Sequence, residues 1–207
     1  MDNYAKNYID TFYTGIKKTK YKISGEKSES SSFFHELNEK TKEVKENGGR
    51  LFFFGNGASA SFSNHMALDW SKNGGILALC LSDSAMLTAL ANDYDFEGCF
   101  LEFLKINSPT SNDLVVTTSS SGNSKNIVKI LEYCKENTIC SFGLSGLNEG
   151  NKTEILSDFS LFVPMKTYGM VECIHQLFHH IFLDKFMGIE EWNKTESQNM
   201  DARNFKL

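Results

Sequence analysis

The stretch Leu51-Phe52-Phe53-Phe54-Gly55-Asn56-Gly57-Ala58-Ser59-Ala60 decides the fold. Its four leading apolar residues predict a short buried strand, and the glycines that follow predict a tight turn into a helix over residues 59–70. The turn fits G-x-G-x-x-A, a pattern typical of dinucleotide-binding loops, but the acidic residue that should follow about 20 positions later is poorly placed, because Asp83 comes too late. A plain turn in which Ser59 caps the helix stays open as an alternative.

Strands and helices alternate from this stretch onward. Apolar runs predict five strands, at residues 51–54, 76–81, 114–118, 139–144 and 159–163. Helical patterns lie between and after them, at residues 59–70, 84–91, 96–106, 123–137 and 170–186. Such alternation indicates an α/β fold, a three-layer sandwich with a parallel sheet covered on both faces. Five strands suit the flavodoxin-like order 2-1-3-4-5, in which ligands bind at the carboxyl ends of the strands.

Two helices are predicted ahead of the first strand. Apolar residues recur at helical spacing in each, the first set being Tyr4, Tyr8, Phe12 and Ile16 and the second running over residues 33–44. The residues between them, 17–32, are rich in Lys, Ser and Gly and are predicted to form a loop. We expect one domain over residues 1–187, whose first 50 residues pack on the domain or on another subunit, and a polar, loose tail over 188–207.

The composition limits the kinds of partner. The 207 residues carry a net charge of −5 with both signs mixed along the chain, which argues against nucleic acid. The longest aliphatic run, residues 76–81, is far shorter than the about 20 residues that cross a bilayer, so no membrane partner is expected. Residues 1–13 contain no apolar run of signal-peptide length. Five cysteines without a C-x-x-C pair indicate buried thiols of a reducing compartment, and the cytoplasm is the expected location.

A serine-rich loop, residues 119–124, follows the third predicted strand and opens a helix. Hydroxyl groups and free backbone N–H groups at a helix N-terminus form an anion site, and Lys125 adds a cation beside it. A serine-rich turn can also serve only as a cap. Two Gly/Ser loops at neighbouring strand ends nevertheless favour one phosphorylated small molecule over a dinucleotide.

One pair of side chains on the first helix of the sandwich could do chemistry. His65 and Asp69 are four residues apart, so they share one face of the helix behind the first loop. Such a pair can bind a metal ion or act as an acid–base couple. The alternative is an ordinary ion pair on the helix surface.

The last predicted helix carries a second group, Glu172, His175, His179 and His180. By spacing, the first three share a face, and His180 points about 100° away from His179. Imidazole and carboxylate groups suit zinc. Because the surrounding residues are apolar, these histidines could also be plain core residues.

Together these residues resemble the sugar isomerase (SIS) domain family, and more closely the phosphoheptose isomerases within it. The resemblance runs over about residues 51–186 and fits the two leading helices as well. Its most specific parts are the loop at 55–60, His65, Asn92-Asp93, the loop at 119–124 and the stretch from Glu172 to His180. It implies a sugar phosphate held by Asn56, Ser59, Asp93, Ser119, Ser120, Ser121, Ser124 and Glu172.

The resemblance also implies one zinc ion per subunit, held by His65, Asp69, Glu172 and His180. The family has Glu and Gln where this chain has Asp69 and Glu172. Asp69 is therefore one methylene shorter than usual, and Glu172 makes the site more negative. Whether His175 or His179 also contacts the metal stays open.

The activity implied is an aldose–ketose isomerisation that converts sedoheptulose 7-phosphate to D-glycero-D-manno-heptose 7-phosphate through an enediol, for bacterial surface polysaccharide. Asp69 and His180 are the expected acid–base pair. A homo-oligomer is expected, most simply a tetramer packed through the leading helices. Two alternatives stay open. One is a non-catalytic SIS protein that binds a phosphosugar or a replication initiator, against which the retained acid–base residues argue. The other is a dinucleotide-binding module, against which the serine-rich loop argues.

Overall fold

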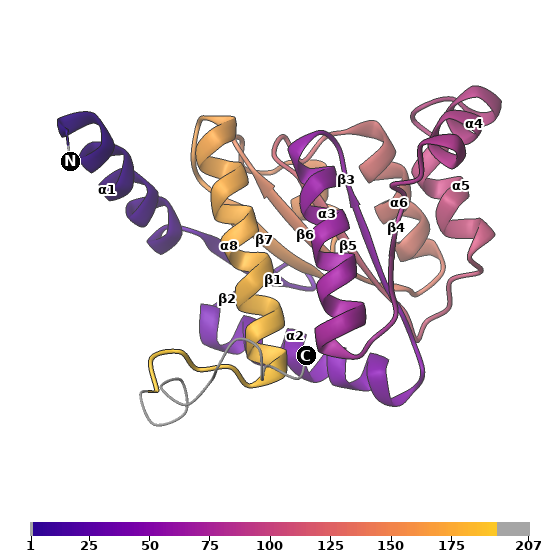
Figure 1. Ribbon diagram of the computed structural model, residues 1–207, viewed down its shortest axis with the longest axis horizontal. Helices are drawn as coiled ribbons and strands as arrows, with labels where there is room; N and C mark the ends of the chain where they lie inside the picture. Colours follow the sequence, from indigo (N-terminus) through magenta and orange to yellow (C-terminus); the bar gives the residue numbers. More distant parts are fainter. Residues whose placement is uncertain (1, 194–207) are drawn as a thin grey trace.

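The computed structural model describes residues 2–193, which form one sheet with helices on both faces (Figure 1). The sheet has seven strands in the order β2-β1-β7-β6-β5-β3-β4. The strands are β1 (Lys20–Ile23), β2 (Glu26–Ser28), β3 (Leu51–Gly55), β4 (Ala78–Cys80), β5 (Leu114–Ser119), β6 (Cys140–Gly146) and β7 (Phe159–Val163). The five strands from β3 to β7 pair in parallel, and their order confirms the predicted 2-1-3-4-5 arrangement.

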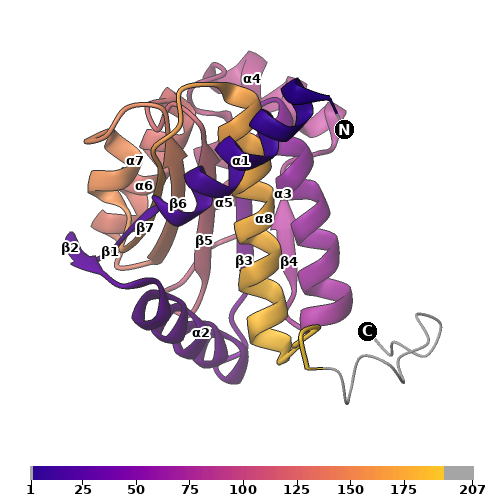
Figure 2. The same cartoon turned by 90° about the vertical axis from the view of Figure 1, so that its left-hand side faces the viewer.

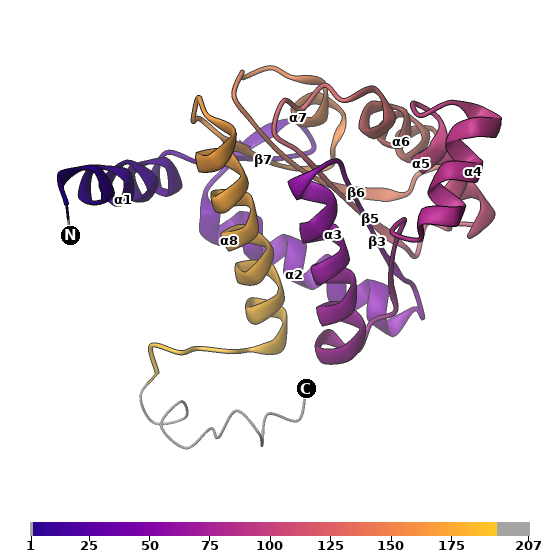
Figure 3. The ribbon, with the colours of Figure 1, turned by 45° about the horizontal axis from the view of Figure 1, so that its top comes forward.

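Helices cover the sheet in two layers (Figures 2 and 3). The helices are α1 (Asn3–Lys17), α2 (Ser30–Glu46), α3 (Ala58–Asp69), α4 (Ser84–Tyr94), α5 (Cys99–Ile106), α6 (Lys125–Glu136), α7 (Lys152–Leu156) and α8 (Tyr168–Met187), and α3 continues into a π-helical turn, η1 (Trp70–Gly74). One layer contains α2, α3 and α8, and the other contains α4, α5 and α6.

Two hydrophobic cores lie on the two faces of the sheet, because successive strand residues point to opposite sides. Phe53 packs in the core formed with α2, α3 and α8, whereas Phe52 and Phe54 pack in the core formed with α4, α5 and α6. Burial on both faces explains why the parallel strands read as continuous apolar runs.

The first two strands correct the sequence prediction. The loop expected at residues 17–32 is wrong, because β1 pairs antiparallel with β7 and β2 pairs antiparallel with β1, which gives seven strands rather than five. Ser24 and Gly25 supply the positive φ angles of 50° and 85° that a two-residue hairpin turn requires. The hairpin is partly exposed and rich in Lys, and its apolar signal is short: Tyr21 and Ile23 alternate with lysines over only the four residues of β1.

Smaller differences concern element ends. The helix expected from residue 96 begins at Cys99, the strand expected at 76–81 is limited to Ala78–Cys80, and the short helix α7 was not expected. Residues 188–193 form turns, and the rest of the predicted tail, 194–207, lies outside the described residues.

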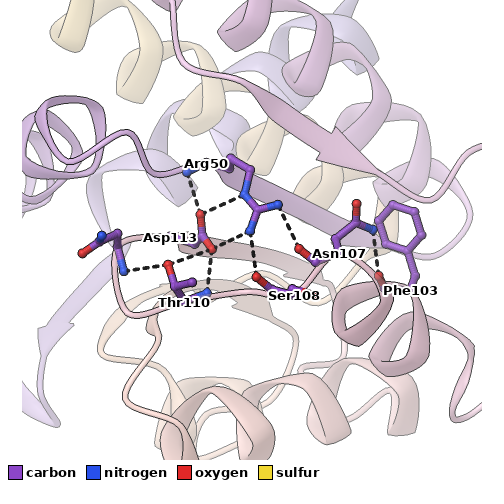
Figure 4. A network of polar contacts seen from close by, with 7 residues as sticks. Arg50, Phe103, Asn107, Ser108, Thr110 and Asp113 are labelled. Carbon is purple, nitrogen blue, oxygen red and sulfur yellow. Dashed lines mark hydrogen bonds and ion pairs between the residues drawn. The ribbon is translucent and has the colours of Figure 1, made fainter.

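Arg50 and Asp113 join the amino ends of β3 and β5 (Figure 4). The buried Asp113 carboxylate accepts hydrogen bonds from the Arg50 backbone N–H at 2.7 Å and from its guanidinium at 3.0 and 3.1 Å. Arg50 also donates to the carbonyls of Asn107 and Ser108. Burial alone would raise the pKa of Asp113, but the hydrogen bonds from Arg50 and Thr110 lower it on balance. The pair fixes β3 against β5, and so fixes how the loops at their carboxyl ends face each other.

Helix α1 extends away from the sheet (Figures 1 and 3). Its last turn packs closely on α8, since a Cβ on Gly15 would lie 2.8 Å from Ile174 Cδ1. Its outer turns expose large apolar side chains: Tyr4 is 76%, Ile9 51% and Tyr13 57% exposed. Within the described residues no element covers these side chains, and none of the helices there is long and apolar enough to cross a membrane.

The five cysteines are all free thiols. Cys99 and Cys134 are buried and Cys80 and Cys140 are half-buried, but Cys173 is exposed on α8, so the prediction of buried thiols is wrong for Cys173. Burial raises the pKa of Cys134 and raises that of Cys140 to about 12. The buried thiols therefore stay protonated and unreactive near pH 7.

Candidate active site

The serine-rich loop turns the chain from β5 into α6. Ser119 Oγ donates to Ser124 Oγ at 3.2 Å, and Ser121 Oγ accepts from the backbone N–H of Asn123 at 3.3 Å. Ser120 Oγ is buried and has no hydrogen-bond partner among the described residues. Ser124 makes no side-chain cap to α6, which leaves N–H groups of the first turn available to an anion.

Gly122 holds this loop against α7. Its φ is +65°, and a Cβ there would overlap the side chain of Asn151. The N–H of Thr153 donates to the Gly122 carbonyl at 2.9 Å, and Asn151 caps α7 by accepting from the N–H of Glu154 at 3.0 Å. The loop is therefore supported from behind by a helix that the sequence did not reveal.

Lys125, the cation expected beside the loop, is paired with a carboxylate. Its ammonium lies 2.6 Å from the Glu97 carboxylate, and both side chains are exposed. The hydrogen bond and charge of Glu97 raise the pKa of Lys125. The anion site therefore depends on hydroxyl and N–H groups more than on this side chain.

The first loop, after β3, is joined to the second through two amides. Asn56 and Asn126 each donate a side-chain N–H to the other's oxygen at 2.9 Å. Ser59 is buried at the start of α3, and its N–H donates to the Asn56 carbonyl at 3.0 Å. The two Gly/Ser loops therefore form one connected edge at the carboxyl ends of β3 and β5.

Three further side chains come together between α3 and α8, which lie side by side (Figures 2 and 3). His65, Asp69 and His180 each offer one ligand atom within 4.8 Å of the others. His65 Nε2 lies 3.2 Å from Asp69 Oδ2, and the rings of His65 and His180 meet edge to face with centroids 5.5 Å apart. The side chain of His65 is 50% exposed and that of Asp69 17%, so the group opens to solvent on the His65 side.

These donors fit a divalent cation such as zinc. Two imidazoles and one carboxylate are ligand types that zinc uses, and two ligands of one zinc ion lie within about 4 Å of each other. The three ligand atoms of His65, Asp69 and His180 lie within 4.8 Å of one another, so small side-chain movements would bring them to the distances that one zinc ion requires. The predicted ligands His65, Asp69 and His180 are therefore brought together within one chain.

His175 and His179 belong to the core. His175 Nε2 donates to the Ser145 carbonyl at 3.0 Å, and His179 Nε2 lies 2.9 Å from Thr118 Oγ1. Burial lowers the pKa of His175 to about 4. Burial also lowers the pKa of His179 to about 3, and the nearby charges of His175 and His180 contribute to this shift. Both rings are therefore neutral at pH 7, and neither belongs to the group of three.

Two predicted site residues lie apart from that group. Glu172 is two helical turns before His180 on α8 and is not one of the three grouped residues. Asp93 is exposed near the end of α4, where it accepts a hydrogen bond from Asn92 at 3.0 Å. Glu172 as a metal ligand and Asp93 as a substrate contact stay predictions.

Gln176 and Asp184 lie one helical turn before and after His180 on α8, and neither was predicted from the sequence as a site residue. Gln176 Nε2 lies 2.9 Å from His180 Nε2. Burial raises the pKa of Asp184, and the charges of His180 and Asp69 act on it in opposite directions. Their spacing of four residues from His180 was the signal that could have identified them.

Comparisons with known proteins show which family the chain belongs to. A family model described as the SIS domain matches residues 23–146. A curated phosphoheptose isomerase of Aneurinibacillus thermoaerophilus is 31% identical over 205 residues, which cover 92% of this chain and 100% of that protein. This chain belongs to the SIS domain family. The phosphoheptose isomerase of Helicobacter pylori (strain Shi470) is 37% identical to this SIS chain over 151 residues, 69% of the chain and 76% of the relative.

Solved structures of SIS proteins have the same fold. The structure of phosphoheptose isomerase GmhA from Neisseria gonorrhoeae is similar with a TM-score of 0.69 and 26% identity, over 76% of this chain and 86% of that chain. A phosphoheptose isomerase from Francisella tularensis has a TM-score of 0.75 at 20% identity, over 92% and 100% of the two chains, and supports the fold alone. Within the SIS family this chain is an enzyme, an isomerase of the phosphoheptose isomerase type.

Proposed function

We propose that this SIS isomerase interconverts sedoheptulose 7-phosphate and D-glycero-D-manno-heptose 7-phosphate through an enediol. The observation that carries the proposal is the His65–Asp69–His180 group, which stands on the helix that the first Gly/Ser loop opens and on the helix beside it. The similarity to phosphoheptose isomerases favours a seven-carbon substrate. We further propose that the product serves bacterial surface polysaccharide and that the enzyme acts in the cytoplasm, for which its free cysteines argue.

The phosphate is proposed to bind at the serine-rich loop. Ser119, Ser121 and Ser124 offer hydroxyl groups beside the first turn of α6, and the buried Ser120 Oγ lacks a partner among the described residues. Charge-assisted hydrogen bonds from such donors are short and strong. Ser59 adds a hydroxyl group from the first loop. Asn56, Asp93 and Glu172 are the proposed contacts of the sugar chain, because these positions resemble the substrate-binding positions of the family.

The acid–base step is proposed for Asp69 and His180. Asp69 removes a carbon-bound proton next to the substrate carbonyl while the carbonyl oxygen takes up a proton, which gives the enediol. His180 then returns a proton at the neighbouring carbon while the other enediol oxygen loses its proton. Proton exchange with solvent returns both side chains to their starting states. Asp69 is mostly shielded from solvent, which suits a group that must hold a proton briefly. A zinc ion, proposed at one per subunit, would supply Lewis-acid polarisation of the carbonyl when bound. Because a group bound to zinc is a poorer base, Asp69 and His180 would alternate between holding the ion and moving protons.

A homotetramer is the proposed assembly. The outer turns of α1 expose large apolar side chains, among them Tyr4, Ile9 and Tyr13, that a partner surface would cover, and closed symmetry is usual for homo-oligomers. Light scattering of the full chain at micromolar concentration tests the proposal. A four-chain mass supports it, and a one-chain mass contradicts it.

Incubation with sedoheptulose 7-phosphate in deuterated water, followed by NMR of the products, tests the reaction. An enediol requires exchange of a carbon-bound proton at C1 or C2 with solvent. We expect an aldose product that carries deuterium. If neither the aldose nor deuterium incorporation is observed, the proposed reaction is wrong, and a panel of other sugar phosphates becomes the next measurement.

A further inference from the structure

Asn126 is buried in the first turn of α6, where its amide pairs with that of Asn56. Asn126 Oδ1 accepts two hydrogen bonds, from Asn56 Nδ2 at 2.9 Å and from the backbone N–H of Ile127 at 3.0 Å. The same N–H also donates to the Ser124 carbonyl at 3.0 Å, a shared bond of the kind common at helix ends. A backbone N–H can only donate, so the oxygen and not the nitrogen of the Asn126 amide must face Ile127.

This orientation passes from Asn126 to Asn56. Asn126 Nδ2 donates to Asn56 Oδ1 at 2.9 Å, so the Asn56 amide can make both bonds of the pair in one orientation only. Within residues 2–193, no other hydrogen bond uses the second side-chain N–H or the second lone pair of Asn56. Because Asn126 is only 3% exposed and Asn56 is half-buried, Asn56 is the member of the pair that a ligand can reach.

We propose that Asn126 is a positioning residue of the substrate site, which fixes the Asn56 amide so that it offers one N–H and one lone pair to the hydroxylated chain of the sugar. A hydroxyl group both donates and accepts, so it matches these two positions. Without Asn126 the Asn56 side chain can rotate, and ordering it again on binding reduces the affinity. The inference rests on the proposed contact between Asn56 and the sugar chain, and it adds a residue that acts without touching the substrate.

Two ligands separate this role from a general disturbance of the loops. Inorganic phosphate fits the serine-rich loop alone, whereas sedoheptulose 7-phosphate also extends to Asn56. Phosphorus NMR titration of the full chain measures an apparent dissociation constant for each. Asn126→Leu is expected to weaken sedoheptulose 7-phosphate binding about tenfold and to leave the affinity for inorganic phosphate unchanged. Asn137→Leu, the same substitution at the exposed far end of α6, is the control and should change neither.

A double variant tests whether Asn126 acts through Asn56. Asn56→Ala alone should weaken sedoheptulose 7-phosphate binding by a similar factor. Adding Asn126→Leu to it should weaken binding no further, because two residues that act through one contact are not additive. A residue that only supports the fold would instead add its own loss to that of Asn56→Ala.

Thermal unfolding checks that each variant folds, and Asn126→Ala replaces Asn126→Leu if the leucine variant does not. The proposal is overturned if Asn126→Leu binds sedoheptulose 7-phosphate with unchanged affinity, if it weakens both ligands equally, or if the two substitutions are additive. It is also overturned if the unmodified chain binds this sugar no more tightly than inorganic phosphate. Turnover is measured separately on the same samples. Sugar binding without turnover counts against the proposed reaction and leaves the role of Asn126 standing.

Discussion

Asn56 and Asn126 exchange two hydrogen bonds of 2.9 Å each and thereby tie the loop after β3 to the first turn of α6. Because each amide faces the other, a substrate contact from Asn56 must use its second N–H or the second lone pair of its oxygen. The residue predicted to bind substrate therefore also positions the two Gly/Ser loops relative to each other.

Removing one hydroxyl of the serine-rich loop should weaken substrate binding. A charge-assisted hydrogen bond contributes about 1.5–3 kcal/mol, so Ser121→Ala should raise the KM for the sugar phosphate about tenfold or more. Ser61→Ala, on the exposed side of α3, is the control and should leave KM unchanged. Steady-state kinetics measure both, and an unchanged KM in both Ser121→Ala and Ser124→Ala would exclude this phosphate site.

Changing the carboxylate of Asp69 should abolish turnover while the fold is retained. Asp69→Asn removes the proposed base, and a general acid–base group contributes about 10²–10⁴-fold to the rate. Asp69→Glu keeps the carboxylate, lengthens it to the family's usual side chain, and should keep part of the activity. Turnover, bound zinc and melting temperature are measured together. Full activity in Asp69→Asn would show that another group is the base.

A side chain at Gly122 should push the serine-rich loop away from α7 and destabilise the protein. Gly122→Ala combines a φ of +65° with an overlap against Asn151, and we expect a loss of about 2–4 kcal/mol of stability. Gly150→Ala is the matched control, because its φ is +75° but nothing lies within 4 Å of the added Cβ, and it should cost about 1 kcal/mol. Urea unfolding measures both variants. Equal losses would mean that the approach of Asn151 does not constrain the loop.

The protein should lose stability in mild acid because of two core histidines. Burial lowers the pKa of His175 to about 4 and that of His179 to about 3, whereas an unfolded histidine has a pKa of about 6.5. As pH falls below 6.5, these two histidines bind protons in the unfolded chain but not in the folded chain. The free energy of unfolding is therefore highest above pH 6.5 and decreases below it. Between pH 7 and 5.5 we expect a loss of about 2.5 kcal/mol from the two residues.

Urea unfolding at the two pH values measures this loss. His175→Gln keeps a donor for the Ser145 carbonyl but removes one titrating ring, so the difference between the two pH values should be roughly halved. The same stability at pH 7 and pH 5.5 would contradict burial of neutral rings.

The parallel part of the sheet could be predicted because its strands are buried on both faces. Residues 51–54 are a continuous apolar run, Phe159–Val163 is interrupted only by Ser160, and the helices between strands are amphipathic or apolar. The β1–β2 hairpin carries no continuous apolar run, because only Tyr21 and Ile23 of β1 pack against the core and lysines alternate with them over four residues. Its Ser24-Gly25 turn was a second available signal.

The site could be predicted only in part. The spacing of His65 and Asp69 follows from the helix itself, but their meeting with His180 depends on how α3 packs against α8. His179 and His180 are neighbours in sequence, and a rotation of about 100° on α8 places one in the core and the other at the site. No pattern along a single helix determines which face turns inward when the whole helix is apolar.

The β1–β2 hairpin also changes what the edge of the sheet presents to other chains. If β7 were the last strand, its apolar residues would stand beside a row of unpaired N–H and C=O groups that any extended chain could join. The hairpin covers that row and substitutes β2, a strand of three residues that includes Glu26 and Lys27. Short charged edges resist strand addition. The β1–β2 hairpin thus protects the folded chain against edge-to-edge aggregation, a property separate from catalysis.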